Sequence, residues 1–307
     1  MIQHQIMALI AIAELGSFRA AAQWLNLSQT ALTKAINTLE DDYGIEVLTR
    51  TARGAQLTEA GKLLYGHALA IVAEEQRAQA DVARIKGESS GEVSVALSPL
   101  CLATLLGSAY RAFREQVPGA RVEFTEFTQP GSLARLREGL HDFVVVGTFD
   151  ADPAHEFDSI DLLTDAGAVA CRRDHPLCRA GSMTELRDAD WIVYAVSRSH
   201  RDVIVQTLGQ EGIHRPDRFA SCSSLTLILP LIVETDAISL LPWRLIGARW
   251  CDGVLMRMPI ADPMPLLTLR LYSRRGSRRS APAQQLIECF CEVARSYQGP
   301  PAQRGPS

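Results

Sequence analysis

Residues Ser17–Glu40 have the sequence SFRAAAQWLNLSQTALTKAINTLE, which predicts two short helices joined by a tight turn. Apolar and small residues recur every three or four positions in the first half, so one face of that helix is apolar. The corresponding stripe in the second half consists of Leu32, Ile36 and Leu39. Ser17 and Ser28 precede the two helices, where a serine hydroxyl can accept a hydrogen bond from a free backbone N–H.

The second helix carries polar side chains on the face opposite its apolar stripe. A short helix divided in this way has the build of a DNA recognition helix. We therefore predict that DNA is contacted by Ser28, Gln29, Thr30, Thr33, Lys34 and Asn37. A merely solvated face is the alternative, and it would be the better interpretation of an isolated helix. The sequence on either side favours the recognition helix.

Two short extended segments, residues 46–50 and 54–58, follow the helices and predict a small hairpin, or wing. Arg50 and Arg53 lie where such a wing reaches the DNA backbone. Phosphate contacts of this kind fix the register of a protein on DNA but carry no sequence information. Together with a helix predicted over residues 2–14, these elements assign residues 1–58 to a winged helix-turn-helix domain.

Charge argues against a protein that coats nucleic acid without specificity. The formal net charge of the 307 residues is −4, and residues 1–62 contain five Lys/Arg and six Asp/Glu. Because bulk attraction is missing, DNA binding has to depend on where the few cations are placed.

A long helix is predicted from residue 59 to residue 86, with Thr58 as its N-cap and Glu59 at the positive end of its dipole. A helix of this length beside a small domain cannot bury its apolar stripe alone. We expect it to pair with the same helix of a second chain, and folding back onto its own domain is the alternative. Residues 59–87 are thus a linker and dimerisation helix, and residues 87–91 are a flexible connection.

Residues 88–298 alternate strands and helices, which predicts an α/β domain with a parallel sheet covered on both faces. The order of the segments divides it into two lobes, residues 92–161 plus 266–298 and residues 162–265. Residues 161–172 are read as two strands and residues 100–116 as one helix. The last residues, 299–307, include three prolines and are expected to be disordered.

Ligands of open parallel sheets bind beyond the carboxyl ends of the strands, where helix N-termini and backbone N–H groups favour negative charge. The candidates at these places are Ser98, Pro99, Leu100, Cys101, Thr128, Gly147, Thr148, Val196, Ser197, Arg198 and Ser223. They predict a cleft for a small organic effector, an anion, with no other cofactor and no metal. Each Ser or Thr taken alone is better explained as a helix cap.

The N-terminal sequence resembles the DNA-binding domain of LysR-type transcriptional regulators. The residues that carry the resemblance are Glu14–Phe18, Ala20–Ala22, Leu25, Leu27–Gln29, Ala31, Ile36, Leu39, Glu40, Gly44, Leu48, Arg50, Thr51, Arg53, Gly54 and Leu57–Gly61. A looser similarity continues through Leu136–Phe143 and Asp174–Leu177. The resemblance covers nearly the whole chain and is most specific in its first ninety residues.

The resemblance implies a sequence-specific transcriptional regulator with a winged helix-turn-helix, a dimerising helix and a two-lobed effector domain like that of periplasmic binding proteins. It further implies double-stranded promoter DNA as partner, a homotetramer, contact with RNA polymerase, and an effector that changes how DNA is bent. Gln29, Thr30, Thr33 and Lys34 match positions that meet bases or phosphates. Ser98, Thr128 and residues 196–199 match positions that line the effector cleft.

Three residues depart from the family pattern. Thr30 stands where the family usually has proline, so the fixed φ that suits a first helical turn is lost. Thr33 replaces the usual serine and keeps the hydroxyl. Thr49 replaces an aromatic residue, which predicts a looser wing. DNA binding is retained in this interpretation, but the preferred operator differs.

Other functional classes find less support. The sequence contains no nucleophile elbow, P-loop, GxGxxG after a strand or HExxH motif, and its seven histidines are scattered, so we expect no enzyme. A thiol-sensing regulator with Cys101 at the cleft is one alternative, and a cytoplasmic solute-binding protein formed by residues 92–297 is a weaker one. Seven cysteines without a CxxC pair, no basic leader and no apolar run near 20 residues favour the cytoplasm and no membrane association.

Overall fold

The computed structural model describes residues 3–51, 54–85, 91–127, 131–149, 156–195, 198–213, 219–276 and 279–296. The chain forms two compact units. The first contains Met1–Ile85, and the second contains most of the chain from Lys86 onward. The predicted connection over residues 87–91 lies outside the described residues except for Gly91, and so does the predicted disordered tail, residues 299–307.

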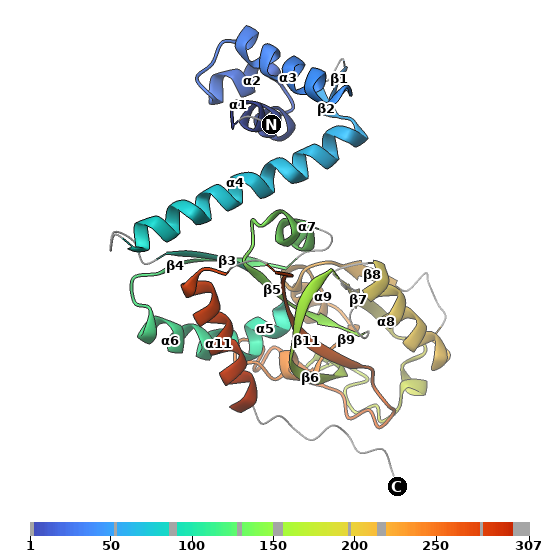
Figure 1. Cartoon of the computed structure of the whole chain (residues 1–307). Helices are drawn as coiled ribbons and strands as arrows, with labels where there is room; N and C mark the ends of the chain where they lie inside the picture. The colour runs from blue at the N-terminus through green and yellow to red at the C-terminus, as the bar shows by residue number, and fades with distance from the viewer. Residues whose placement is uncertain are drawn as a thin grey trace. The chain divides into compact units, whose positions relative to one another are not determined.

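The described residues of the N-terminal unit form four helices and a two-stranded hairpin (blue to cyan in Figure 1). In chain order these are α1 (Gln3–Leu15), α2 (Phe18–Trp24), α3 (Gln29–Tyr43), β1 (Leu48–Thr51), β2 (Gly54–Leu57) and α4 (Glu59–Ile85). The predicted caps are confirmed: the Ser17 hydroxyl accepts from Ala20 N–H at 3.4 Å and the Ser28 hydroxyl from Ala31 N–H at 3.1 Å.

The core of this unit lies between α1 and the helices that follow it. Its apolar stripes meet there, and the side chains of Leu9, Ile12, Leu32, Ile36 and Leu39 are at most 2% exposed. After α3 the chain leaves the helix through Gly44, whose φ of 66° suits glycine. The Glu40 carboxylate then accepts from the Val47 N–H at 2.8 Å, which positions the segment leading to the wing.

The C-terminal unit is built on one sheet with helices on it. The strands are β3 (Glu92–Leu97), β4 (Arg121–Glu126), β5 (Phe143–Thr148), β6 (Phe157–Arg172), β7 (Asp190–Tyr194), β8 (Phe219–Cys222), β9 (Ala237–Pro242), β10 (Leu255–Arg257) and β11 (Leu266–Arg274). The helices are α5 (Pro99–Thr104), α6 (Leu106–Gln116), α7 (Gly131–Glu138), the short 3₁₀ helix η1 (Met183–Leu186), α8 (Arg198–Gln210), α9 (Leu225–Glu234), α10 (Trp243–Ile246) and α11 (Ala281–Ser296).

The sheet is mixed, not wholly parallel as the alternation of strands and helices suggested. Among the described residues its strand order is β4-β3-β5-β11-β6-β9-β7-β8, with β10 also paired to β6. Strands β3, β4 and β5 are parallel in one lobe, and β7, β8 and β9 are parallel in the other. Between them, β11 is antiparallel to β5 and β6, and β6 is antiparallel to β9.

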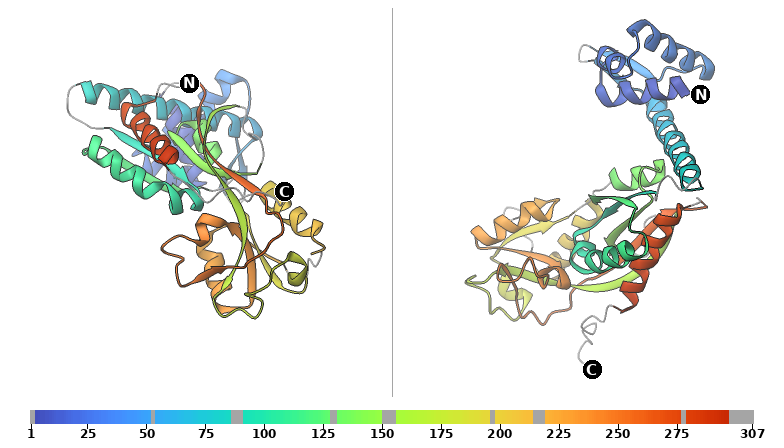
Figure 2. Two further views of the ribbon diagram at one scale, coloured as in Figure 1. Left: turned by 90° about the horizontal axis from the view of Figure 1, so that it is seen from below. Right: turned by 90° about the vertical axis from the view of Figure 1, so that its left-hand side faces the viewer.

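Residues 161–172 form part of one long strand, so the prediction of two strands there was wrong. Strand β6 pairs with β11 from Phe157 to Ala166 and with β9 from Gly167 to Ala170. It therefore belongs to both lobes, and Figure 2 shows β6 and β11 side by side through the C-terminal unit. The strand stays continuous although its partner changes from β11 to β9 along its length.

Two further local predictions needed correction. The single helix expected over residues 100–116 is divided at Leu105, which is fully buried between α5 and α6. The small elements η1 and β10 were not predicted at all, because each is too short to show a periodicity. Among the described residues, no helix is both long enough and apolar enough to span a membrane.

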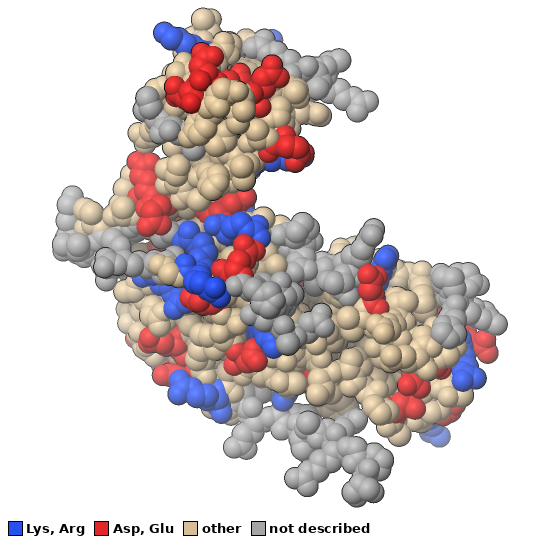
Figure 3. Space-filling model, turned by 45° about the vertical axis from the view of Figure 1, so that its right-hand side comes forward, with Lys and Arg blue, Asp and Glu red and all other residues tan. Residues whose placement is uncertain are grey.

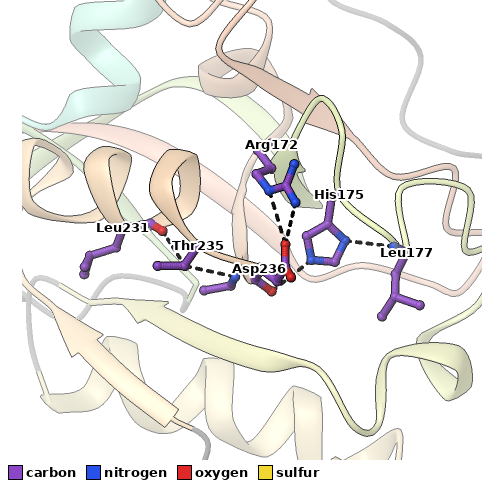
Figure 4. Close-up of polar contacts among 7 residues, drawn as sticks. Arg172, His175, Leu177, Leu231, Thr235 and Asp236 are labelled. Carbon is purple, nitrogen blue, oxygen red and sulfur yellow. Dashed lines mark hydrogen bonds and ion pairs between the residues drawn. The ribbon is translucent and has the colours of Figure 1, made fainter.

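The turn at Asp174–Leu177 is fixed by a buried histidine (Figure 4). His175 accepts from the Leu177 N–H through Nδ1 at 3.0 Å, so its Nε2 donates to the Asp236 carbonyl oxygen at 2.9 Å. The Asp236 carboxylate also pairs with the Arg172 guanidinium at 2.6 Å. These contacts therefore hold the end of β6 against the start of β9. The residues of this turn thus have a structural role.

Candidate functional site

Helix α3 presents the predicted recognition face to solvent. Gln29, Thr30, Lys34 and Asn37 are exposed and Thr33 is half-buried, while the opposite stripe is buried in the core. Ser28 is exposed too, but its hydroxyl caps α3. Since none of these side chains belongs to the packed core, the polar face is available for contact with a nucleic acid. The individual contacts stay predictions.

The wing is a regular antiparallel hairpin, paired from Leu48 with Leu57 to Thr51 with Gly54. Its second strand is held against the turn before α2, because the Ala55 N–H donates to the Gly16 carbonyl oxygen at 2.9 Å. Gly54 has a φ of 123° and lies so close to Gly16 that a side chain there would collide with its carbonyl oxygen. Arg50 belongs to β1, but its side chain, like the whole of Arg53, lies outside the described residues.

The described charges of the N-terminal unit are mostly acidic on the face visible in Figure 3. Two of its carboxylates have structural partners: Glu40 accepts from Val47 and Leu48, and Asp42 accepts from Gln5 at 3.0 Å. The exposed Lys34 on α3 is therefore a cation in a unit with no basic excess. Attraction of DNA to this unit would therefore depend on the position of single cations such as Lys34 and not on the net charge of the unit.

A second candidate site is a cavity of about 40 Å³ in the C-terminal unit, between the two lobes. The carboxyl ends of β3, β5, β7 and β9 all reach it. Its lining consists of Ser98, Pro99, Leu100, Val146, Gly147, Phe149, Gly167, Tyr194, His200, Ile204, Leu240, Leu241, Pro242, Leu245, Pro265 and Leu267. Ligands of α/β sheets bind at such strand ends, so this cavity is the candidate effector site.

The predicted effector residues divide into three groups. Ser98, Pro99, Leu100 and Gly147 line the cavity. Cys101, Thr148 and Ser223 do not: Cys101 is in the core, Thr148 accepts from Arg270 at 3.2 Å, and Ser223 is exposed after β8. Thr128, Val196 and Ser197 lie outside the described residues, and so does the side chain of Arg198, which begins α8. As a set, these effector contacts stay predictions.

Two hydroxyls of the lining are buried without a described hydrogen-bond partner, the Ser98 Oγ and the Tyr194 Oη. Ser98 occupies the N-cap position of α5, but its side chain makes no capping hydrogen bond. A buried polar group left without a partner costs about 1–3 kcal/mol, so its persistence calls for an explanation.

His200 brings an aromatic surface to the same cavity. Its ring lies 4.8 Å from that of Phe149 and 6.3 Å from that of Tyr194, measured between centroids. Burial lowers the pKa of His200 to about 4, so the imidazole is neutral near pH 7. Most of the described lining is apolar, and it contains no lysine or arginine.

Several cavity residues were not predicted from the sequence, among them Tyr194, His200 and Leu240–Pro242. Tyr194 and Leu240–Pro242 had a usable signal, because they lie at the carboxyl ends of β7 and β9, on the edge where ligands bind. His200 had none, since one histidine near the start of a helix has no pattern of its own.

The cysteines give little support to the thiol-sensor alternative. Cys101 is fully buried in the core of the first lobe, and burial raises the pKa of its thiol far above the usual range. A reactive cysteine needs an accessible thiolate, and a buried neutral thiol is inert. Among the described residues, moreover, no group of three or more His, Cys, Asp or Glu side chains is arranged to hold a metal ion.

Family comparisons match both units. Residues 3–62 match the model described as "Bacterial regulatory helix-turn-helix protein, lysR family", and residues 86–295 match "LysR substrate binding domain". The transcriptional regulator TdcA of Escherichia coli is 25% identical over 285 residues, 92% of this chain and 90% of that protein. PtxR of Pseudomonas aeruginosa is 28% identical over 304 residues, 96% and 93% of the two chains.

Solved structures show the same fold. The LysR family regulator CbnR aligns with a TM-score of 0.71 and 23% identity, over 96% of this chain and 99% of CbnR. Full-length CbnR complexed with its target DNA aligns with a TM-score of 0.69 and 22% identity, over 96% and 99% of the chains. With both units matched by family models along most of its length, the chain belongs to the LysR family of DNA-binding transcriptional regulators and carries that family's effector-binding domain.

Proposed function

We propose that this regulator binds promoter DNA through the exposed face of α3 and the β1–β2 wing. In this proposal α3 enters the major groove, where Gln29, Thr33 and Lys34 face bases or phosphates and the methyl group of Thr30 contacts a thymine methyl. Arg53 of the wing holds the backbone, which sets the register. The main support is that α3 exposes this polar row while its other face is buried.

The protein acts as an oligomer in this proposal, with two copies joined through α4. The helix is continuous from Glu59 to Ile85, as a dimerising element must be. Along one side of it, Leu63, Ile71 and Val82 are 66%, 45% and 50% exposed. Apolar side chains in a row of this kind are buried when two such helices pair. Two dimers then form the tetramer expected from the sequence.

A small organic effector in the cavity modulates DNA binding. It can do so only if it binds one arrangement of the lobes better than another. Strands β6 and β11 connect the two lobes. They pair with each other, β11 also pairs with β5 of the first lobe, and β6 also pairs with β9 of the second lobe. The negative charge inferred for the effector from the sequence stays a prediction, as does contact with RNA polymerase. The role is regulatory rather than catalytic, and its place is the cytoplasm, where promoter DNA lies.

Footprinting on the DNA upstream of the protein's own gene tests this function. Lys34→Ala should weaken protection at physiological salt by about 1–3 kcal/mol, the value of one good base contact, and leave the fold intact. Lys62→Ala is the matched control, because Lys62 is an exposed lysine that pairs with Glu59 at the start of α4. If the Lys34→Ala footprint is as strong as that of the control, the proposed contact between α3 and DNA is contradicted.

A further inference from the structure

The two partnerless hydroxyls of the cavity come from opposite lobes. Ser98 follows β3 in the first lobe, and Tyr194 ends β7 in the second. Each residue is only 6% exposed, and neither oxygen has a described hydrogen-bond partner. Both residues line the same cavity. Both hydroxyls are therefore candidates for hydrogen bonds with a molecule in this cavity.

The surroundings of these hydroxyls are apolar and partly aromatic. The rings of Phe149 and His200 lie 4.8 Å apart between centroids and are tilted by 40° to each other, and Leu240 and Leu267 contribute further apolar surface. Burial keeps His200 neutral near pH 7 by lowering its pKa. The pKa of Tyr194 is raised, first by burial and then by the negative charge of Glu126. No described side chain of the lining brings a positive charge to offset a full anion.

From this arrangement we propose that the cavity binds a small aromatic compound with one oxygen-bearing head group, to which Ser98 and Tyr194 donate hydrogen bonds from opposite lobes. The inference rests on the proposed effector site and specifies the class of ligand. The rings of Phe149 and His200 contact the aromatic body. A carboxylate and a carboxamide offer the same accepting oxygen, and the lack of described positive charge favours the carboxamide.

Binding of such a compound has to enlarge the cavity. The cavity measures about 40 Å³, whereas a cavity that takes up benzene measures roughly 150 Å³. Once the cavity has enlarged to admit the ring, the two new hydrogen bonds link the lobes through the ligand. The ligand thus favours one lobe arrangement, as modulation of DNA binding requires.

The experiment is a calorimetric titration of the full-length protein with three matched probes: phenylacetamide, phenylacetate and ethylbenzene. Phenylacetamide should bind at least as tightly as phenylacetate, and ethylbenzene, which has no head group, at least about 10-fold more weakly. Ser98→Ala and Tyr194→Phe should each weaken phenylacetamide binding about 2- to 10-fold. Ser98→Thr, which keeps the hydroxyl, should restore most of the loss.

The controls are Ser108→Ala and Tyr110→Phe, the same chemical changes at exposed positions of α6 outside the cavity lining. They should bind the probes like the original protein. Tighter binding of phenylacetate, still dependent on both hydroxyls, would support the two-hydroxyl site and identify its head group as a carboxylate.

The inference is overturned if none of the probes binds, if ethylbenzene binds as well as the others, or if Ser98→Ala and Tyr194→Phe bind like the controls. Thermal unfolding of each variant shows whether it is folded. Footprinting with the same protein preparations distinguishes a failure of this ligand inference from a failure of the proposed DNA-binding role. An intact footprint with no probe binding refutes this inference alone, whereas probe binding without any footprint refutes the proposed DNA-binding role.

Discussion

The Asp165 carboxylate accepts two hydrogen bonds from Arg244, one from its backbone N–H at 3.0 Å and one from its guanidinium at 2.9 Å. The Asp165 side chain is buried and that of Arg244 is mostly covered, with exposed fractions of 2% for Asp165 and 10% for Arg244. The pair fixes the start of α10 on β6, the strand that both lobes share. Because α10 supplies Leu245 to the cavity, this ion pair also shapes the candidate effector site.

Replacement of Asp165 by asparagine should therefore be costly. Asp165→Asn keeps the size of the side chain but removes the negative charge that faces the Arg244 guanidinium, which is expected to cost about 3–5 kcal/mol of unfolding free energy. Urea denaturation measures the loss. Asp161→Asn is the control, because Asp161 also pairs with an arginine, Arg270, but is 61% exposed, so its change should stay within about 1 kcal/mol. Equal losses in the two variants would contradict the assigned role.

Gly61 allows the N-terminal end of α4 to approach the wing segment closely. A β-carbon at this position would lie 1.9 Å from the Val47 carbonyl oxygen, which is backbone and cannot turn aside. Gly61→Ala should destabilise the N-terminal unit by about 1–3 kcal/mol, as overpacking does. In the same helix Gly66 has no such neighbour, the nearest atom being 3.9 Å away, so Gly66→Ala should be neutral or stabilise by up to about 1 kcal/mol. Thermal melts of the two variants compare the positions directly.

The apolar row on α4 gives a prediction about assembly. Leu63→Glu combined with Ile71→Glu places two charges on the surface proposed to pair with a second chain. The expected result is a shift toward monomer in sedimentation or light scattering at micromolar concentration, because the charges would be buried without partners. Lys62→Glu, an exposed position on another side of the helix, should leave the assembly unchanged. A double variant with the original molar mass would show that α4 does not form the interface.

His200 predicts a specific pH dependence of stability. Its folded-state pKa of about 4 lies below the ordinary value near 6.5, so the unfolded chain binds its proton first as the pH falls. The contribution of His200 to the free energy of unfolding is therefore complete above the unfolded-state pKa and is lost between pH 6.5 and 4. Between pH 7 and pH 5 the free energy of unfolding should fall by about 2 kcal/mol from this cause. In His200→Leu this part of the pH dependence should disappear, as urea titrations at the two pH values would show. The exposed residue His4 provides the control, because His4→Leu should keep the original dependence.

Much of the N-terminal unit could be predicted because its signals are local. The Ser17 and Ser28 caps and the spacing of the apolar stripe in α3 each act within a few residues, and all are observed. The polar face of α3 followed from the same periodicity. In the C-terminal unit the alternation of strands and helices was also predictable, since each segment has its own short pattern. Which segments pair, and in which direction, depends on contacts far apart in the chain.

The sequence alone determined the family and the helix-turn-helix, and it placed candidate ligand groups at the ends of strands. Only the tertiary structure decided that β6 is one strand shared by two lobes and that Cys101 faces the core. It also brought Ser98 and Tyr194 to one cavity, although 95 residues of chain lie between them. The physical reason is that periodicity and capping report on neighbours along the chain, whereas burial and the pairing of polar groups are settled by whichever distant residues the fold brings together.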